Sequence, residues 1–285
     1  MASILDRYGI KEVADVTFYE IDKNTGERGK PVLYLDTLKV STIEQTAETA
    51  DARGGKGNPK LISWDYGKEI NVTIEDALFS SKSMAIMFGN GSVNLEESKD
   101  ITRTVVVRLD NTGKLPKSFV ADVYDAESGS SKRKKIIMDG TPSGSEEIAF
   151  ASSGITLVSL ISESGKEIDS NLTKEEWTTA HDTYKNQKAF ITYTVKATTR
   201  TITISGDSFP GTYYITGDTY ARSDVTGADQ FFQFIIPKAK VTSENTITLE
   251  AEGDPSVFSM NLTVLRPESG EMMKLVQYDL TGAAG

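Results

Sequence analysis

Residues 60–73 read KLISWDYGKEINVT, and this stretch decides the fold class. Trp64 and Tyr66 lie on one side of an extended chain, and Ile70 and Val72 continue the two-residue period. Successive side chains of a β-strand point to opposite faces, so this spacing is typical of a strand. The stretch therefore predicts a long β-strand.

Comparable alternation occurs along most of the chain. It predicts strands at 13–21, 32–40, 101–109, 118–124, 155–161, 189–195, 201–204, 212–220, 230–236, 246–250, 257–265 and 273–278. So many short strands at close intervals predict a mainly β fold, arranged as a sandwich or a barrel. The sequence shows no internal repeat that would indicate a propeller or a solenoid.

Short α-helices are predicted at two places. Residues 75–89 begin with acidic side chains, carry apolar residues at helical spacing and end at Gly89. Residues 174–182 follow Thr173-x-x-Glu176, the spacing of a capping box. The opening residues 3–8, closed by Gly9, favour one further helical turn.

The composition excludes several classes of protein. The 285 residues include 31 Lys and Arg against 41 Asp and Glu, which gives a net charge of -10 and argues against tight binding of nucleic acid. DNA can still pass such a surface without adhering to it. The absence of cysteine excludes disulfides and thiolate zinc sites. No signal peptide and no membrane-spanning run is evident, so we expect folding in a reducing cytosol and no membrane partner.

Residues that could support catalysis are few. The single histidine, His181, lies in the second predicted helix, where we expect a surface position. Residues 53–58, RGGKGN, lack the Gly-Lys-Ser/Thr ending of a phosphate loop. The basic run 132–135 is expected at a solvated hairpin tip. We therefore predict that the protein is not an enzyme and has no metal ion or cofactor.

The segment after residue 41 is almost devoid of apolar side chains, and we predict a long polar loop ending at Pro59. Loops of this length in a compact domain are either functional or disordered. Its glycines are expected to allow one backbone to approach another closely.

Two stretches together resemble a known family. Residues 52–70 and 75–80, from ARGGKGNPKLISWDYGKEI to EDALFS, resemble the glycine-rich loop, strand and helix entry of the major tail tube proteins of tailed bacteriophages. Residues 231–241, FFQFIIPKAKV, and 249–260, LEAEGDPSVFSM, resemble their closing strands. The resemblance covers about 10–90 and 189–280, and the inner tube of type VI secretion systems is similar in design.

This resemblance implies a fold and a set of partners. The fold would be a mainly β tail-tube sandwich or barrel with one or two short helices, whose inner strands complete a barrel shared by several subunits. Subunits would form homohexameric rings that stack into a tube holding the tape measure protein and later passing DNA, with a sheath protein as a further partner in some tails. The protein would belong to the virion tail and assemble in the host cytoplasm.

Domain organisation is expected to follow the same pattern. Residues 1–285 would form a single tail tube domain with an insertion at about 111–187. A duplicated tube fold, which would give trimeric rings, is the alternative. The strands at 13–21, 60–73 and in the 230s are the candidates for the lumen, and the acidic excess implies an electronegative channel.

The polar loop would make the contacts between rings. Arg53 is the candidate for pairing with a carboxylate across that interface. The residues expected in this inter-ring loop are Thr42, Glu44, Glu48, Asp51, Arg53, Gly54, Gly55, Lys56, Gly57, Asn58 and Pro59.

The rival hypothesis is a β-sandwich module that binds carbohydrate or a cell surface, as bacterial adhesins do. Such a module needs exposed aromatic residues on a concave face and usually a secretion signal. The chain has only two tryptophans, Trp64 and Trp177, and the signal is not evident.

Overall fold

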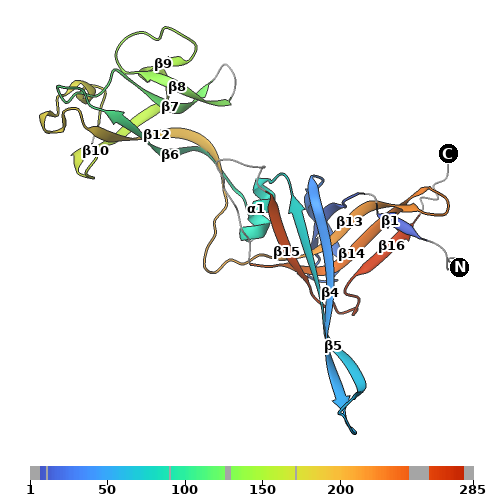
Figure 1. Cartoon of the computed structure of the whole chain (residues 1–285). Helices are drawn as coiled ribbons and strands as arrows, with labels where there is room; N and C mark the ends of the chain where they lie inside the picture. The colour runs from blue at the N-terminus through green and yellow to red at the C-terminus, as the bar shows by residue number, and fades with distance from the viewer. Residues whose placement is uncertain are drawn as a thin grey trace, which may run out of the picture. The chain divides into compact units, whose positions relative to one another are not determined.

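The computed structural model describes residues 7–10, 12–89, 91–125, 130–170, 172–243 and 257–278. The chain divides into two compact units (Figure 1). Unit 1 takes Met1–Asn94 and Thr201–Gly285, and unit 2 takes Leu95–Arg200. The insertion predicted at about 111–187 lies inside the bounds of unit 2.

The described residues of unit 1 form one antiparallel sheet of nine strands. Seven strands follow the order β3-β2-β13-β14-β15-β5-β4, while β1 pairs with β13 and β16 pairs with β14. Their bounds are β1 Tyr8–Ile10, β2 Asp15–Ile21, β3 Arg28–Leu35, β4 Leu38–Arg53, β5 Lys60–Asp76, β13 Thr212–Ser223, β14 Asp229–Val241, β15 Phe258–Val264 and β16 Lys274–Tyr278. The mainly β fold class predicted from alternation is confirmed.

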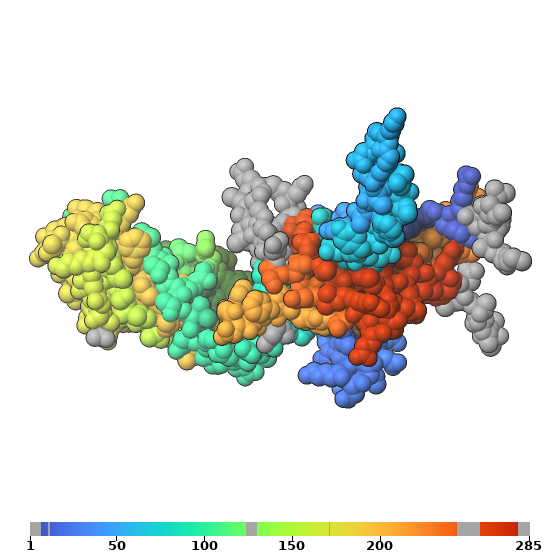
Figure 2. Space-filling view, turned by 90° about the horizontal axis from the view of Figure 1, so that it is seen from below, coloured from blue at the N-terminus to red at the C-terminus, as the bar shows by residue number. Residues whose placement is uncertain are grey.

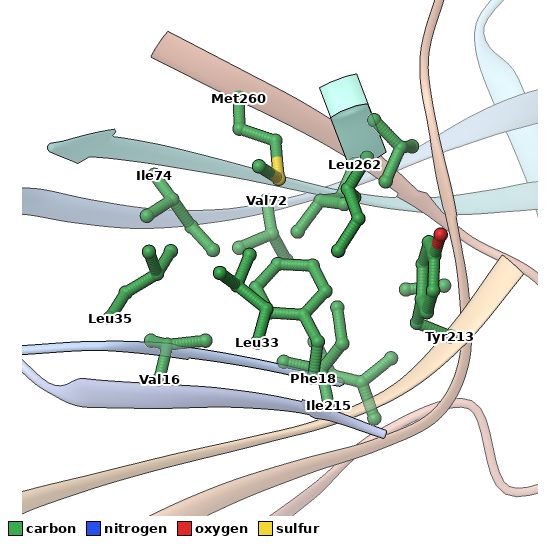
Figure 3. Close-up of a cluster of buried hydrophobic side chains, with 14 of the residues drawn as sticks. Val16, Phe18, Leu33, Leu35, Val72, Ile74, Tyr213, Ile215, Met260 and Leu262 are labelled. Carbon is green, nitrogen blue, oxygen red and sulfur yellow. The ribbon is translucent and has the colours of Figure 1, made fainter. Parts of the chain in front are cut away.

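The core of unit 1 lies on one face of this sheet. Every second residue of β15 is buried, as the alternation of FSMNLTV requires. Figure 3 shows the ring of Phe18 among aliphatic side chains from several strands, and it meets Tyr213 edge-on with the ring centroids 5.9 Å apart. Burying a side chain of this size contributes about 1.5–3 kcal/mol, so the core stabilises unit 1 without disulfides.

The helix α1, Ser81–Phe88, follows β5 and is shorter than the predicted helix at 75–89. The Ser80 hydroxyl accepts a hydrogen bond from the backbone N–H of Ser83, and the Ser83 hydroxyl accepts one from the backbone N–H of Ser80. These two hydrogen bonds fix the start of the helix. Gly89 ends it, as predicted, by donating its N–H to the Ala85 carbonyl. The prediction placed the start too early because the acidic residues at 75 and 76 are the last residues of β5.

Unit 2 contains two sheets with a core of their own. One sheet has the order β11-β10-β12-β6 and the other β7-β8-β9. Their bounds are β6 Asn94–Arg108, β7 Ser118–Asp125, β8 Ser130–Ile137, β9 Glu147–Ala149, β10 Ile155–Ser162, β11 Glu167–Asp169 and β12 Lys188–Thr201, with single 3-10 turns η1 at Phe150–Ser152, η2 at Glu176–Thr178 and η3 at Asp182–Tyr184. Phe119 of β7 packs against Trp177 and against Tyr193 of β12, so side chains from both sheets form one buried cluster.

The second predicted helix, at 174–182, is wrong. Its capping box does form, because Thr173 and Glu176 exchange hydrogen bonds between side chain and backbone at 2.8 and 3.3 Å. The chain then makes only η2 and reaches extended geometry at Thr179. The two threonines that follow buried Trp177 have low helix propensity, so the cap starts a turn that does not propagate.

Several strand boundaries also differ from the prediction. The strand expected at 32–40 is divided by Asp36 and Thr37 between β3 and β4, and that expected at 201–204 is only the last residue of β12. The basic run 132–135 lies within β8, not at a hairpin tip. The three-residue strands β1, β9 and β11 are too short to show a period. The strand expected at 246–250 and most of the helical turn at 3–8 lie outside the described residues, although Tyr8 belongs to β1.

The largest correction concerns the polar loop predicted to end at Pro59. The chain from Leu38 to Arg53 is the sixteen-residue strand β4, paired with β5 in a long antiparallel hairpin. The sequence pattern did not predict this hairpin, because apolar and polar residues alternate only where one face of a strand is buried. Nearly all of β4 is exposed on both faces, so its sequence carries no apolar period.

Candidate assembly interface

The β4–β5 hairpin extends beyond the core of unit 1. Near its root, Ile70, Val72 and Ile74 of β5 are buried, and they pair with Gln45, Ile43 and Ser41 of β4. From Lys60 to Glu69 every residue of β5 is exposed. We call residues 46–69 the arm, and Figure 2 shows its light-blue atoms projecting from the rest of unit 1.

A bulge marks the base of the arm. Between the pairs Thr46–Glu69 and Glu48–Tyr66, β5 has two residues where β4 has only Ala47. The first of the two, Gly67, has a φ of 61°, a backbone conformation that glycine adopts without strain. A bulge bends the strand and increases its twist, so the arm departs here from the plane of the sheet.

One face of the arm is apolar and exposed. Ile62, Trp64 and Tyr66 of β5 share this face, and their exposed fractions are 53%, 55% and 54%. Their partners across the hairpin are Ala52, Ala50 and Glu48. An isolated two-stranded hairpin is marginally stable in water, and an exposed row of large apolar side chains marks an interaction surface. We name this row, Ile62, Trp64 and Tyr66, the arm face.

Polar residues away from the arm face pair with one another. Leu61 is the one large apolar residue of the arm outside the arm face, and it is 63% exposed. Asp51 accepts hydrogen bonds from Lys60 and Ser63, both at 2.8 Å, and Arg53 lies 3.4 Å from its other carboxylate oxygen. The bond from Lys60, followed by that from Ser63, lowers the pKa of Asp51. On the arm face, the hydrogen bond with Glu48 raises the pKa of Tyr66. These polar residues are therefore satisfied by one another, whereas the apolar residues of the arm face are left open to solvent.

The turn at the tip, Gly54–Pro59, is closed by backbone hydrogen bonds. Gly54 donates to the Pro59 carbonyl at 3.2 Å and Asn58 to the Gly55 carbonyl at 3.1 Å. Gly55 and Gly57 both have positive φ, and a side chain at either position would meet nothing within 4 Å. Within the chain, left-handed backbone geometry explains these two glycines. The expected close approach of backbones concerns a neighbouring ring and stays a prediction.

The predicted inter-ring residues fall on three parts of this hairpin. Thr42 and Glu44 lie at its root on β4, opposite Thr73 and Asn71. Glu48, Asp51 and Arg53 lie on the arm, and the residues from Gly54 to Pro59 form the tip. Sequence reasoning placed Trp64 and Tyr66 on one face and made their strand a candidate for the lumen, but it did not assign that face to contacts between rings. The sequence did contain a signal for this face, because Trp64 and Tyr66 alternate with polar residues, next to a segment that is otherwise polar.

His181 does not lie in a helix, and it is half-buried, not a surface residue. It precedes η3, its N–H donates to the Gly113 carbonyl at 3.0 Å, and its ring Nε2 has no hydrogen-bond partner. The described residues contain no cluster of three or more His, Asp or Glu arranged to hold a metal ion. Within the same part of the chain no helix has the length and apolarity to span a membrane.

Comparison with known proteins connects this architecture to a family. The model of the YomU/Tube protein family matches residues 8–146 and 132–277, which together span most of the chain. The chain belongs to the YomU/Tube protein family. A search of curated proteins finds no match. Membership identifies a protein of the phage tube type, in agreement with the mainly β fold.

The two matched stretches are not two separate domains of this tube-family protein. Strands β2 and β5 come from the first stretch, and they pair directly with β13 and β15 from the second. The nine-stranded sheet of unit 1 therefore needs both stretches to form.

Proposed function

We propose that the chain is the major tail tube protein of a tailed bacteriophage, a structural and non-enzymatic component of the virion. Copies close into rings of six, and the rings stack into a tube that holds the tape measure protein and later conducts DNA during ejection. Assembly takes place in the host cytoplasm, and a sheath protein is a further partner where the tail is contractile.

The β4–β5 hairpin is the observation that carries this proposal. Among the described residues, β3 pairs only with β2 and β4 only with β5, so both ends of the sheet of unit 1 are open. The open edge of β4 runs for sixteen residues without proline. Long unprotected edges cause aggregation unless another strand pairs with them. A barrel shared by neighbouring copies would close these edges, as membership of a tube family leads one to expect.

The arm serves ring-to-ring contact in this proposal. Its apolar face has no partner inside the described chain, and its tip projects away from the core. The Arg53 side chain is 51% exposed despite its contact with Asp51, so it remains available for a carboxylate of a neighbouring copy.

The face of the sheet opposite the core is the candidate lining of the channel. Asp15 of β2 and Asp218 of β13 are directly paired on this face, and both are exposed. Tyr34 donates to Asp15 at 3.1 Å and Gln233 donates to Asp218 at 2.6 Å, which holds both carboxylates in place. Rows of such carboxylates around a channel would keep DNA from adhering to its wall.

Six copies are favoured over three. A duplicated tube fold would place one complete sheet in each half of the chain, whereas the sheet of unit 1 interleaves strands from both halves. We therefore treat unit 2 as the insertion. The mass of a single detached ring distinguishes six copies from three.

Negative-stain electron microscopy of the purified chain tests the proposal. Rings or long hollow tubes are expected. A protein that stays monomeric at high concentration, or that forms only small discrete oligomers, contradicts the proposal and favours a binding module.

Matched variants test the arm. Trp64→Lys puts a charge in the middle of the arm face and is expected to stop stacking, leaving single rings. Thr49→Lys puts the same charge on the opposite face, across from Asp65, and is expected to leave tube length unchanged. Equal effects of the two substitutions would show that the apolar face is not the contact.

A further inference from the structure

The two ends of β5 both present exposed apolar side chains. The arm face lies near the amino end of the strand. Just beyond its carboxyl end, Leu78 and Phe79 are 64% and 54% exposed. We call these two residues the knob. Because one extended strand separates the arm face from the knob, only a second copy can bring the two surfaces together.

The knob is held by defined contacts. The Asp76 carboxylate accepts the N–H of Leu78 at 3.2 Å and the hydroxyl of Thr37 at 2.5 Å. The ring of Phe79 lies against that of Phe258, with 4.2 Å between the centroids. The knob thus forms the exposed rim of an apolar cleft whose floor includes Ile74 and Met260. The backbone of Leu78 and the ring of Phe79 are therefore held in exposed positions, which lowers the entropy lost when a partner binds.

Charge is complementary between the two regions. Residues 51–60 at the end of the arm contain Arg53, Lys56 and Lys60 against Asp51 alone, a net charge of +2 (3 − 1) even though Asp51 contacts Arg53 and Lys60. Beside the knob, the Thr37 carbonyl accepts the N–H of Ala77 at 3.1 Å, which brings exposed Asp36 next to it, and half-buried Glu75 precedes it in β5. Opposite charges of this kind guide partners into register.

We propose that the arm of one copy docks on the knob of a copy in the adjacent ring. The arm face would cover Leu78 and Phe79, and the basic tip would approach Asp36 and Glu75. This inference rests on the proposed function and names the receiving surface that stacking requires. A contact between different surfaces of identical copies generates an open stack when its rotation does not close into a ring, and a contact from one ring to the next is of this kind.

The docking predicts the spacing of the stack. Trp64 and Asp76 are twelve residues apart in one strand (76 − 64), which corresponds to at most about 40 Å at about 3.3 Å per residue, because the bulge at Gly67 bends the strand between them. A strand tilt of about 40° from the tube axis reduces the axial component to about 30 Å. Rings joined in this way repeat every ~30–40 Å, and a repeat well outside that range in micrographs of the unmodified protein overturns the docking.

Cysteine cross-linking tests the contact directly, because the native chain has no cysteine. Tubes of the double variant Trp64→Cys, Phe79→Cys are expected to give a ladder of covalent multimers on mild oxidation. The control Trp64→Cys, Phe209→Cys places the second thiol at another residue of unit 1, 65% exposed, and is expected to remain monomeric. If the Trp64 substitution itself stops assembly, Ile62→Cys on the same face replaces it.

The outcomes separate this inference from the proposed function. Tubes that form but give no ladder with either arm position show that the arm docks elsewhere, which overturns the knob and leaves the tube function intact. An unmodified chain that forms neither rings nor tubes contradicts the tube function itself.

Discussion

Gly217 leaves no room for a side chain in the sheet of unit 1. It pairs with Phe234 across β13 and β14, and a Cβ atom at Gly217 would lie 2.1 Å from the phenyl ring. We expect Gly217→Ala to destabilise the protein by about 1–3 kcal/mol, because the buried ring has to move. Chemical denaturation measures this loss. Gly206→Ala, where the added carbon meets nothing within 4 Å, is the control and should be nearly neutral.

For the pair of Asp15 with Asp218, we expect a substitution that stabilises the protein. Like charges directly opposite each other on neighbouring strands destabilise a sheet by roughly 0.2–1 kcal/mol. Asp218→Asn keeps the oxygen that accepts the Gln233 hydrogen bond and removes the repulsion, so the isolated subunit should unfold at a higher temperature. Asp207→Asn, in an exposed loop, should leave the unfolding temperature unchanged. An equal rise in both variants would point to net charge as the cause.

At the scale of the element, Glu147 ties β9 to β8. Its carboxylate accepts three hydrogen bonds, each of 2.9 Å. They come from the ammonium group of Lys135 and from the backbone N–H and the hydroxyl of Ser143. The backbone bond from Ser143, then the bond from Lys135, lowers the pKa of Glu147 from 4.5 to about 2. A pKa lowered by folding adds stability above the unfolded value, and that stability is lost as pH falls from about 4.5 to about 2.

The pH dependence of unfolding checks this contact. The thermal midpoint of unit 2 should fall less steeply between pH 5 and pH 2 in Glu147→Gln than in the native protein. Glu146→Gln changes an exposed neighbour and should keep the native slope. Parallel curves for all three proteins would mean that Glu147 does not stabilise unit 2.

Elements with a buried face could be predicted from the sequence, and elements without one could not. The strands β13 and β15 alternate because each second side chain enters a core, and the predicted bounds agree within a few residues. The strand β4 gave no such signal, since nearly all of it is exposed on both faces. The capping box of Thr173 was recognised, but the propensity of the following threonines decided the outcome.

The candidate interface was predicted in part. The polar loop predicted from the sequence contains the tip, because Gly54 to Pro59 are its last residues. The sequence did not show that the residues from Thr42 to Arg53 are a strand, and it missed Leu78 and Phe79 as a surface. Their exposure depends on where β5 ends and α1 begins, and the acidic residues at that junction were assigned to the wrong element.

At the scale of the whole molecule, the two tryptophans report on different events. Trp177 is buried in unit 2, where its indole N–H donates to the Pro116 carbonyl at 2.5 Å, whereas Trp64 is half-exposed on the arm. Fluorescence of Trp177 should therefore follow the unfolding of unit 2. Fluorescence of Trp64 should move to shorter wavelength when the arm loses water on docking.

The placement of these two residues supplies an intrinsic optical probe of polymerisation. The blue shift on tube formation should persist in Trp177→Phe, provided that unit 2 still folds, and disappear in Trp64→Phe, whose ring still fits the contact. A shift that survives in Trp64→Phe would assign the signal to unit 2. Tail growth is thus open to observation in real time, in solution and without any attached dye.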